Sequence, residues 1–360
     1  MNPTESTSTA CLRELVQQSC PVHLLRESGC GDDVLRRWSE RHRVWHGPEH
    51  LRSLLADFAD VPAGDERDIL RLAAIYHDAI YNPLRADNED ASAALLIRHA
   101  ADRTNRIVQR AAEIIVASKW NKVPADTLTW RFWEADCKPL AADYPLASRV
   151  AYERAIFREY QWASWTTYRE KRAEFLRDWS HRFSQQREGV EVCLGLLEGL
   201  SPRVAVYPGS FNPFHRGHLS ILRQAERIFD KVIIGVAVNR RKSGAVDTLE
   251  ARRAELQARL CFHEVAGVPG LLTDFVEQFP LQLSVVRGVR DGTDLEAELR
   301  YARFLGELRP ETNVVWIGCE AELQHLSSSA IRELESIAIG SGSRYVPDTA
   351  GIYGLVGDGH

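Results

Sequence analysis

The sequence predicts two domains of different fold class, an all-α domain followed by an α/β domain built on a parallel sheet. Three observations support this prediction. The chain has 360 residues, enough for two domains, and 44% of them are hydrophobic. Eight of the nine tryptophans lie between Trp38 and Trp179, in a region with few strand-like runs. After Pro202, short β-rich runs alternate with helical stretches, which is typical of a parallel sheet with helices on both faces.

The first half contains long segments in which apolar residues recur every three or four positions, a spacing that predicts helices with one buried face. Residues 1–30 leave two alternatives open, a frayed tail or a further helix. The segments that we expect to be helical are Arg67–Ile80, Asn105–Ser118 and Leu146–Phe183.

The boundary between the halves is expected at Leu200–Arg203, because a helix that ends in Gly199 there meets Ser201-Pro202. The expected domains are therefore residues 1–200 and 203–360. In the second domain the expected strands are Val204–Tyr207, Val232–Val238, Leu283–Val289 and Val314–Ile317. The expected helices are His218–Phe229, Leu249–Leu260, Asp294–Leu308 and Ser329–Glu335.

Composition and charge exclude several classes of protein. The net charge is −5 and the isoelectric point is near 6.2, so the basic excess of a nucleic-acid-binding protein is missing. The seven cysteines form no C-x-x-C pair, which favours reduced thiols. The N-terminal stretch lacks the pattern of a signal peptide, and no apolar run approaches the roughly 18 residues that span a bilayer. We expect a soluble, cytoplasmic protein without nucleic-acid or membrane partners.

The segment Tyr207–His218, YPGSFNPFHRGH, follows an expected strand and opens an expected helix, which is where α/β sheets bind ligands. Gly209 and Gly217 let the backbone approach a phosphate closely, and the amides of a helix N-terminus attract anions. His215 and His218 can donate hydrogen bonds to a triphosphate as charge develops on its α-phosphate. The alternative is a Gly/Pro loop with two histidines of no function, but the strand–loop–helix setting favours phosphate binding.

This segment resembles the signature of the H-x-G-H nucleotidyltransferases, and most of all that of the pantetheine-phosphate adenylyltransferases of coenzyme A synthesis. Further segments resemble the same family in the same order: Val236–Lys242 with Leu249–Arg253, Val286–Arg290 with Asp294–Glu298, and Leu326–Arg332. The resemblance covers roughly residues 203–347. It implies a Rossmann-like nucleotidyltransferase domain that moves AMP from ATP, with Mg²⁺, onto a small phosphorylated acceptor and releases pyrophosphate.

The resemblance also implies roles for individual residues. Catalysis is assigned to His218, His215 and Lys242. Contact with the acceptor is assigned to Ser210, Lys242, Leu272 and Arg287. Binding of the nucleotide is assigned to Gly209, Ser210, Phe211, Gly217, Arg290, Glu298, Ser327, Ser328, Ser329 and Arg332. Taken singly, Lys242 is compatible with a solvated charge, Arg290 with a surface ion pair, and the three serines with a helix cap.

The identity of the acceptor stays open between two candidates. The pantetheine family usually carries threonine where this chain has His215, and the Leu271-Leu272 region matches the family pattern only loosely. The full H-x-G-H form is similar to that of nicotinamide mononucleotide adenylyltransferases, which make NAD. The acceptor is therefore 4′-phosphopantetheine or nicotinamide mononucleotide. The resemblance to the pantetheine family also implies a homo-oligomer.

A second group of residues, in the first half, has the composition of a metal site. His46 and His50 are four positions apart and can share one side of a helix. His77-Asp78 closes an expected apolar helix, and Asp136 follows an aromatic run. Imidazole and carboxylate ligands suit a divalent metal, which can turn bound water into a nucleophile at neutral pH. An adjacent His-Asp pair alone is weak support, because chance or core packing explains most such pairs.

On separate expected helices, this spacing resembles the HD superfamily of metal-dependent phosphohydrolases over roughly residues 30–200. The segments Arg43–His50, Asn88–Ala93 and Tyr152–Tyr160 are similar to one bacterial branch, in which a histidine is expected where this chain has Trp120. The resemblance implies an all-α HD domain, and thus either a bifunctional enzyme or a transferase with a non-catalytic, regulatory HD domain. The implied metal ligands are His50, His77, Asp78 and Asp136, and the implied substrate or water contacts are His46 and Glu89.

Overall fold

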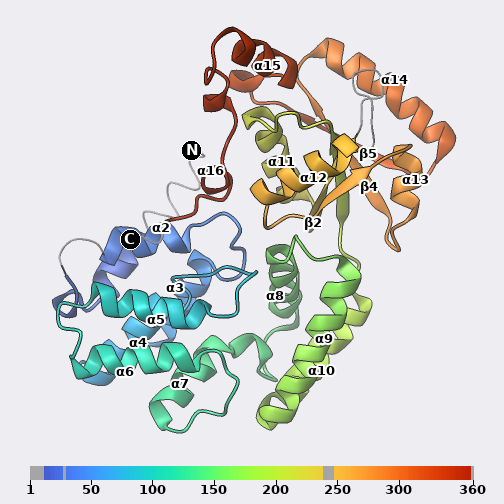
Figure 1. Ribbon diagram of the computed structural model, residues 1–360. Coiled ribbons are helices and arrows are strands. Elements are labelled where there is room, and N and C mark those ends of the chain that lie inside the picture. The colour runs from blue at the N-terminus through green and yellow to red at the C-terminus, as the bar shows by residue number, and fades with distance from the viewer. Residues whose placement is uncertain (1–11, 27–29, 238–246, 358–360) are drawn as a thin grey trace. The chain divides into compact units, whose positions relative to one another are not determined.

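The computed structural model describes residues 12–26, 30–237 and 247–357 (Figure 1). The chain divides into two compact units and passes between them four times, whereas the sequence predicts one boundary, at Leu200–Arg203. The first unit consists of Met1–Glu159, Arg169–Gly199 and Gly354–His360, and the second of Tyr160–Tyr168 and Leu200–Tyr353.

The described part of the first unit is helical, with an isolated β-bridge between Leu25 and Ala100. Asn105 and Asp126 accept hydrogen bonds from backbone amides and thereby cap α6 and α7. The α-helices are α2 (Cys30–Trp38), α3 (Pro48–Asp57), α4 (Asp65–Tyr76), α5 (Asn88–His99), α6 (Arg106–Ala117), α7 (Thr127–Asp136), α8 (Leu146–Glu159), α9 (Trp165–Arg182) and α10 (Arg187–Gly199). Short 3-10 helices cover η1 (Val22–Leu24), η2 (Lys138–Leu140) and η3 (Ser184–Gln186).

The expected helix Leu146–Phe183 is interrupted between α8 and α9. The residues between the two helices belong to the second unit, where the carbonyls of Gln161 and Ala163 accept hydrogen bonds from the buried ammonium of Lys231. The prediction of one continuous helical segment was therefore wrong at this point.

The second unit is built on a parallel sheet of strand order β3-β2-β1-β4-β5, as the alternation of strands and helices predicts (Figure 1). The strands are β1 (Val204–Gly209), β2 (Lys231–Ala237), β3 (Val265–Val268), β4 (Leu283–Val289) and β5 (Asn313–Gly318). The α-helices are α11 (Arg216–Ile228), α12 (Asp247–Arg259), α13 (Leu272–Glu277), α14 (Gly292–Leu308), α15 (Ser328–Ile337) and α16 (Thr349–Tyr353). Short 3-10 helices cover η4 (Ala321–Leu323) and η5 (Ser343–Tyr345).

Helices cover both faces of this sheet. Leu272 and Phe275 of α13 and Leu305 of α14 pack on one face, in a cluster that also holds alternate residues of β1 and β4. On the other face, a Cβ added to Gly288 of β4 would meet Ile221 of α11 at 3.0 Å. The chain order reverses between β1 and β4, and ligands of such sheets bind at the carboxyl ends of the strands on either side of that point.

Among the residues that the structure describes, none of the helices has the length and apolar character that a membrane crossing requires.

Candidate active site and candidate metal centre

A cleft of about 340 Å³ opens at the carboxyl ends of β1 and β4, where the strand order reverses. Its walls come from the β1–α11 loop, the end of β4, the first turns of α14 and the start of α15. Residues predicted from the sequence account for most of its lining. Those that the structure brings together there are Gly209, Ser210, Phe211, His215, Gly217, His218, Arg287, Arg290, Glu298, Ser327, Ser328 and Ser329.

Three residues with predicted roles are not among those lining the cleft. Leu272 belongs to the hydrophobic core and is 6% exposed. Arg332 lines a different cavity, which is described below. Lys242 lies outside the described residues. The roles of these three residues stay predictions.

The two histidines of the cleft form a reciprocal cap at the start of α11. His215 is the N-cap residue, and its Nδ1 accepts a hydrogen bond from the backbone N–H of Gly217 at 3.2 Å. The backbone N–H of His215 in turn donates to Nδ1 of His218, also at 3.2 Å. The two rings stack with their centroids 3.7 Å apart. Backbone amides can only donate, so Nδ1 carries no proton in either ring and Nε2 carries it in both.

The two rings are also held in their neutral form. Burial, together with the nearby Arg290, lowers the pKa of His215 to about 4. Burial likewise holds the pKa of His218 well below its ordinary value, with smaller contributions from His215 and Arg290. Near pH 7 the cleft therefore holds two uncharged imidazoles, each with an Nε2–H donor. Neutral donors of fixed orientation can stabilise a developing phosphate charge without first losing a proton.

Two glycines keep this loop tight. A Cβ on Gly209 would lie 2.8 Å from the ring of Phe211, and a Cβ on Gly217 would lie 3.0 Å from the ring of His215. Phe211 itself has a φ of 45°, in the left-handed region that bulky residues rarely adopt. Any side chain at either glycine would have to displace an aromatic ring at the edge of the cleft.

The arginines of the cleft are each paired with a carboxylate of α14. Arg287 donates to the two oxygens of Glu298 at 2.6 and 2.5 Å. Arg290 donates to Asp294 at 2.6 and 2.9 Å. These carboxylates raise the pKa of both guanidinium groups, with burial opposing the shift, so both stay charged. Glu298, for which the sequence implied a contact with ATP, thus holds Arg287 in this structure.

The start of α15 closes the cleft opposite the histidines. Ser327 is the N-cap, and its side chain accepts from the amide of Ala330 at 3.1 Å. The hydroxyl of Ser328 donates to the carbonyl of Pro213 at 3.0 Å and so ties α15 to the β1–α11 loop. The helix-cap alternative and the anion-site prediction are therefore compatible, because one helix end serves both purposes.

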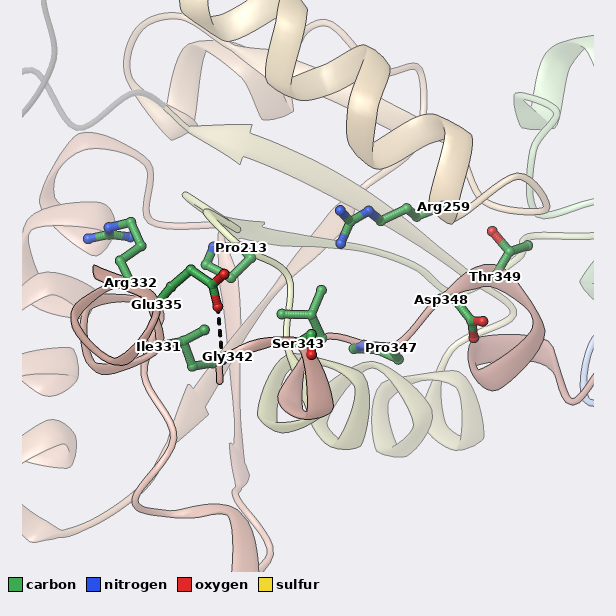
Figure 2. Close-up of a pocket in the computed structure, with 11 residues that line it drawn as sticks. Pro213, Arg259, Ile331, Arg332, Glu335, Gly342, Ser343, Pro347, Asp348 and Thr349 are labelled. Atoms are coloured by element: carbon green, nitrogen blue, oxygen red, sulfur yellow. Dashed lines mark hydrogen bonds between the residues drawn. The ribbon is translucent and has the colours of Figure 1, made fainter. Parts of the chain in front are cut away.

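Arg332 is among the residues that line a second cavity of about 540 Å³ (Figure 2). Its guanidinium donates to the carbonyl of Asn212 and to Ser329, and it thereby connects α15 to the β1–α11 loop. Glu335, on the same wall, accepts from the amides of Gly340 and Gly342 at 2.6 and 2.9 Å. Figure 2 shows this wall facing Arg259 across the cavity.

Sequence reasoning missed Tyr207, Asp294 and Cys319, which also line the cleft. Tyr207 begins the segment Tyr207–His218, and Asp294 begins the segment Asp294–Glu298, but the resemblance assigned a role to neither residue. Cys319 follows β5 directly, so its place at the carboxyl end of a strand was the available signal.

In the first unit, the four predicted metal ligands converge. His50 Nε2 lies 3.3 Å from His77 Nε2 and 3.1 Å from Asp136 Oδ1. His77 Nε2 lies 3.1 Å from Asp78 Oδ2 and 3.5 Å from Asp136 Oδ1. Within the part of the chain that the structure describes, ligand atoms of His50, His77 and Asp78 all lie within 4.8 Å of one another. Nitrogen and oxygen donors gathered in this way suit a divalent transition metal.

The hydrogen bonding of His77 fits a metal ligand. Its Nδ1 lies 3.0 Å from the carbonyl of Ala74, which can only accept, so Nδ1 carries the proton and Nε2 keeps a free lone pair in the neutral ring. Burial would lower the pKa of His77, but Asp78 and Asp136 raise it well above its ordinary value. The histidines in turn hold the pKa values of Asp78 and Asp136 far below their usual range, against the effect of burial.

His46 lies beside this cluster and contacts a buried carboxylate, Glu159. No role for Glu159 was predicted from the sequence. Glu159 Oε1 accepts from the backbone amides of Val44, Trp45 and His46 at 2.6–2.8 Å. Its Oε2 lies 2.6 Å from His46 Nδ1 and accepts from the hydroxyl of Tyr81 at 2.8 Å. The pKa of His46 would be lowered by burial but is raised overall by Glu159. Glu89 is half-buried, and its pKa is raised by burial, with Asp78 adding to the rise.

Comparison with known proteins concerns the second half of the chain. Residues 206–334 match the cytidylyltransferase-like family model. A phosphopantetheine adenylyltransferase of Clostridium botulinum (strain Alaska E43 / Type E3) is 37% identical over 136 residues, which are 37% of this chain and 84% of that protein. One of Rubrobacter xylanophilus (strain DSM 9941 / JCM 11954 / NBRC 16129 / PRD-1) is 36% identical over 147 residues, 40% of this chain and 88% of that protein. The prediction of a nucleotidyltransferase in the second half is confirmed.

Among solved structures, the crystal structure of the lipopolysaccharide core biosynthesis protein from Thermoplasma volcanium GSS1 matches 33% of this chain and 98% of its own. The two are 20% identical, and the TM-score of 0.25 supports no conclusion.

Proposed function

Through its second half the chain belongs to the phosphopantetheine adenylyltransferase family, and from this we propose that it transfers AMP from ATP to the phosphate of 4′-phosphopantetheine, with release of pyrophosphate. The observation that carries the proposal is the pair of neutral Nε2–H donors on His215 and His218, fixed by backbone amides in a cleft at the carboxyl ends of β1 and β4.

In this proposal the phosphates of ATP lie between the two histidines and the N-terminus of α15. His218 and His215 donate to the α-phosphate as an oxygen of the acceptor phosphate attacks it in line. The serines Ser327, Ser328 and Ser329 and the helix amides bind the departing pyrophosphate. Bringing the two phosphates together in this orientation supplies much of the acceleration in such transfers.

Two arginines complete the site in this proposal. Arg287, held by Glu298, binds the acceptor, and Arg290, held by Asp294, binds the nucleotide. Ser210 and Lys242 bind the acceptor phosphate. Since Asp294 and Glu298 are both paired with arginines, Mg²⁺ enters as the companion ion of the ATP phosphates rather than as a ligand of these carboxylates.

The acceptor is tested by pyrophosphate release from ATP with a panel of acceptors: 4′-phosphopantetheine, nicotinamide mononucleotide, nicotinate mononucleotide and sugar phosphates. We expect release with 4′-phosphopantetheine at a kcat/KM at least about a hundredfold above that with nicotinamide mononucleotide, a ratio equivalent to about 2.7 kcal/mol. A higher kcat/KM with nicotinamide mononucleotide would contradict the assignment and favour an enzyme that makes NAD.

For the first half we propose a metal-dependent phosphohydrolase of the HD type. Support comes from the convergence of two imidazoles and two carboxylates, with His77 Nδ1 already bound to a backbone carbonyl. His50, His77, Asp78 and Asp136 would hold a divalent metal, which would lower the pKa of a bound water. His46, held by Glu159, and Glu89 would contact the phosphate or the water.

This second activity is tested with purified full-length chain and the phosphate ester probes p-nitrophenyl phosphate and bis-p-nitrophenyl phosphate in the presence of Mn²⁺. We expect hydrolysis that is lost, together with bound metal, in His77→Ala. The matched control is His23→Ala, which changes an exposed histidine of the same unit outside the cluster. Metal binding without hydrolysis, together with a transferase rate that responds to His77→Ala, would instead indicate a regulatory domain.

A further inference from the structure

Trp120 has an unusual backbone conformation beside the metal cluster of the first unit. Its φ is 48°, in the left-handed region that bulky side chains rarely occupy. The conformation is held from two sides, because its N–H donates to the carbonyl of Ala117 at 2.9 Å and its own carbonyl accepts from Arg182 at 2.8 Å. Only 5% of the residue is exposed. A strained and buried residue of this kind suggests a specific role for its side chain.

The indole of Trp120 is directed at one oxygen of a metal ligand. Its Nε1–H donates to Oδ2 of Asp136 at 2.7 Å. The other oxygen, Oδ1, faces the imidazoles, 3.1 Å from His50 Nε2 and 3.5 Å from His77 Nε2. An indole N–H can donate but cannot bind a metal. The two oxygens of Asp136 therefore have different surroundings, a donor on one side and the ligand cluster on the other.

Aromatic packing fixes the plane of the indole. The ring of Trp120 lies 6.2 Å from that of Phe132, and Phe132 makes an edge contact with His77, with their centroids 5.5 Å apart. Phe132 and Asp136 lie four positions apart on α7, so the same helix presents the packing surface and the carboxylate. Neither the indole nor the carboxylate can turn without disturbing a ring that packs on a metal ligand.

We propose that Trp120 is a positioning residue that holds Asp136 with one oxygen, Oδ1, directed at the metal ion of this cluster. The inference rests on the metal centre of the proposed phosphohydrolase. The indole N–H bound to Oδ2 fixes the carboxylate so that Oδ1 faces the imidazoles of His50 and His77.

The test is a Co²⁺ titration of the metal-free, full-length chain, followed by visible absorption and by metal analysis. Co²⁺ is the probe because its d–d bands report the geometry of its ligands. We expect one Co²⁺ per wild-type chain. Trp120→Phe keeps the aromatic packing and removes the donor, so it should still bind one Co²⁺, with a Kd raised about 10- to 100-fold and altered bands.

The matched control is Trp133→Phe. Trp133 is buried on α7, the same helix as Asp136, and its indole nitrogen has no hydrogen-bond partner among the described residues. The control loses the same atoms without losing a donor bond, and its Kd and spectrum should match those of the wild type. Far-ultraviolet circular dichroism and an unchanged transferase rate establish that each variant is folded.

Different results overturn different parts of the account. A folded Trp120→Phe protein with wild-type Kd and spectrum would overturn the positioning role while leaving the metal centre intact. No binding of Co²⁺ by the wild type would overturn the proposed phosphohydrolase and the inference together.

Discussion

In one unit the Nδ1 atoms of the site histidines accept hydrogen bonds from backbone N–H groups, and in the other unit Nδ1 of His77 donates to a backbone carbonyl. In the cleft of the second unit, Nδ1 of His215 and Nδ1 of His218 accept from backbone amides, which leaves a proton on each Nε2. In the cluster of the first unit, Nδ1 of His77 donates to the carbonyl of Ala74, so in the neutral ring the lone pair is on Nε2. The same side chain thereby suits the donor role that we propose in one unit and the metal-ligand role that we propose in the other.

This difference shows that the backbone group beside Nδ1 decides what an imidazole can do. The first turn of a helix offers free N–H groups, and the last turn offers free carbonyls. His215 and His218 lie at the start of α11, whereas His77 follows the end of α4. The position of a histidine relative to helix ends is therefore informative about its tautomer and its chemistry.

The largest expected effect follows from removing a donor of the cleft. We expect His218→Ala to lower kcat for pyrophosphate release roughly a hundredfold or more, because an N–H that stabilises the transition state is lost. The KM for ATP should change far less. Steady-state kinetics with ATP and 4′-phosphopantetheine measures both quantities. His181→Ala, which changes an exposed histidine of α9, is the control, and a His218→Ala rate equal to it would remove the donor role.

A smaller effect is expected from the segment that the first half contributes to the second unit. The side chain of Gln161 accepts from the amide of Val232 at 2.9 Å and donates to the carbonyl of Asp230 at 3.3 Å. We expect Gln161→Ala to destabilise the second unit by about 1–3 kcal/mol, the cost of a buried N–H left without a partner.

Calorimetry on the full chain measures this effect. The unfolding transition of the second unit is identified as the one whose midpoint temperature rises on addition of ATP. Gln185→Ala, at an exposed glutamine, should leave that transition in place. Equal midpoint temperatures of this transition in Gln161→Ala and Gln185→Ala would show that residues 160–168 are not an integral part of the second unit.

The smallest effect concerns pH. The folded pKa of His215 is about 4, below the unfolded value of roughly 6.5, so between these values the unfolded chain binds a proton that the folded chain does not. The resulting stability is complete above about pH 6.5 and is lost as the pH falls. His215→Asn keeps a side-chain acceptor at the N-cap. It should reduce the slope of the free energy of unfolding against pH by up to about 1.4 kcal/mol per pH unit. Calorimetric scans from pH 7.5 to 5 measure this slope. Equal slopes for the wild type and His215→Asn would contradict a neutral His215 ring.

Local sequence patterns predicted much of the fold, and long-range partners account for what they missed. Four of the five strands are apolar runs that can be recognised without their neighbours. The strand β3, Val265–Val268, is short and contains a glycine, and it is a strand because β2 pairs with it. The residues in the break of Leu146–Phe183 bind Lys231, about 70 positions away, a partner that no periodicity reveals.

The candidate sites divide in the same way. The β1–α11 loop could be predicted because its glycines and histidines are contiguous. Cys319 reaches the cleft only through the order of the strands, and Glu159 reaches His46 from 113 positions away. The partner of Trp120 was equally hidden, because the indole meets Asp136 only when α7 packs beside the end of α6.

The most direct test of the contrast between donor and ligand histidines is long-range ¹H–¹⁵N NMR of the imidazoles in Zn²⁺-loaded protein at pH 7, assigned with single-histidine variants. The predicted result is a neutral Nε2–H tautomer for both His215 and His218, and an Nδ1–H ring with Nε2 bound to Zn²⁺ for His77. A doubly protonated ring or an Nδ1–H tautomer at His218 would contradict the account of the cleft, and an Nε2–H proton on His77 would contradict that of the cluster.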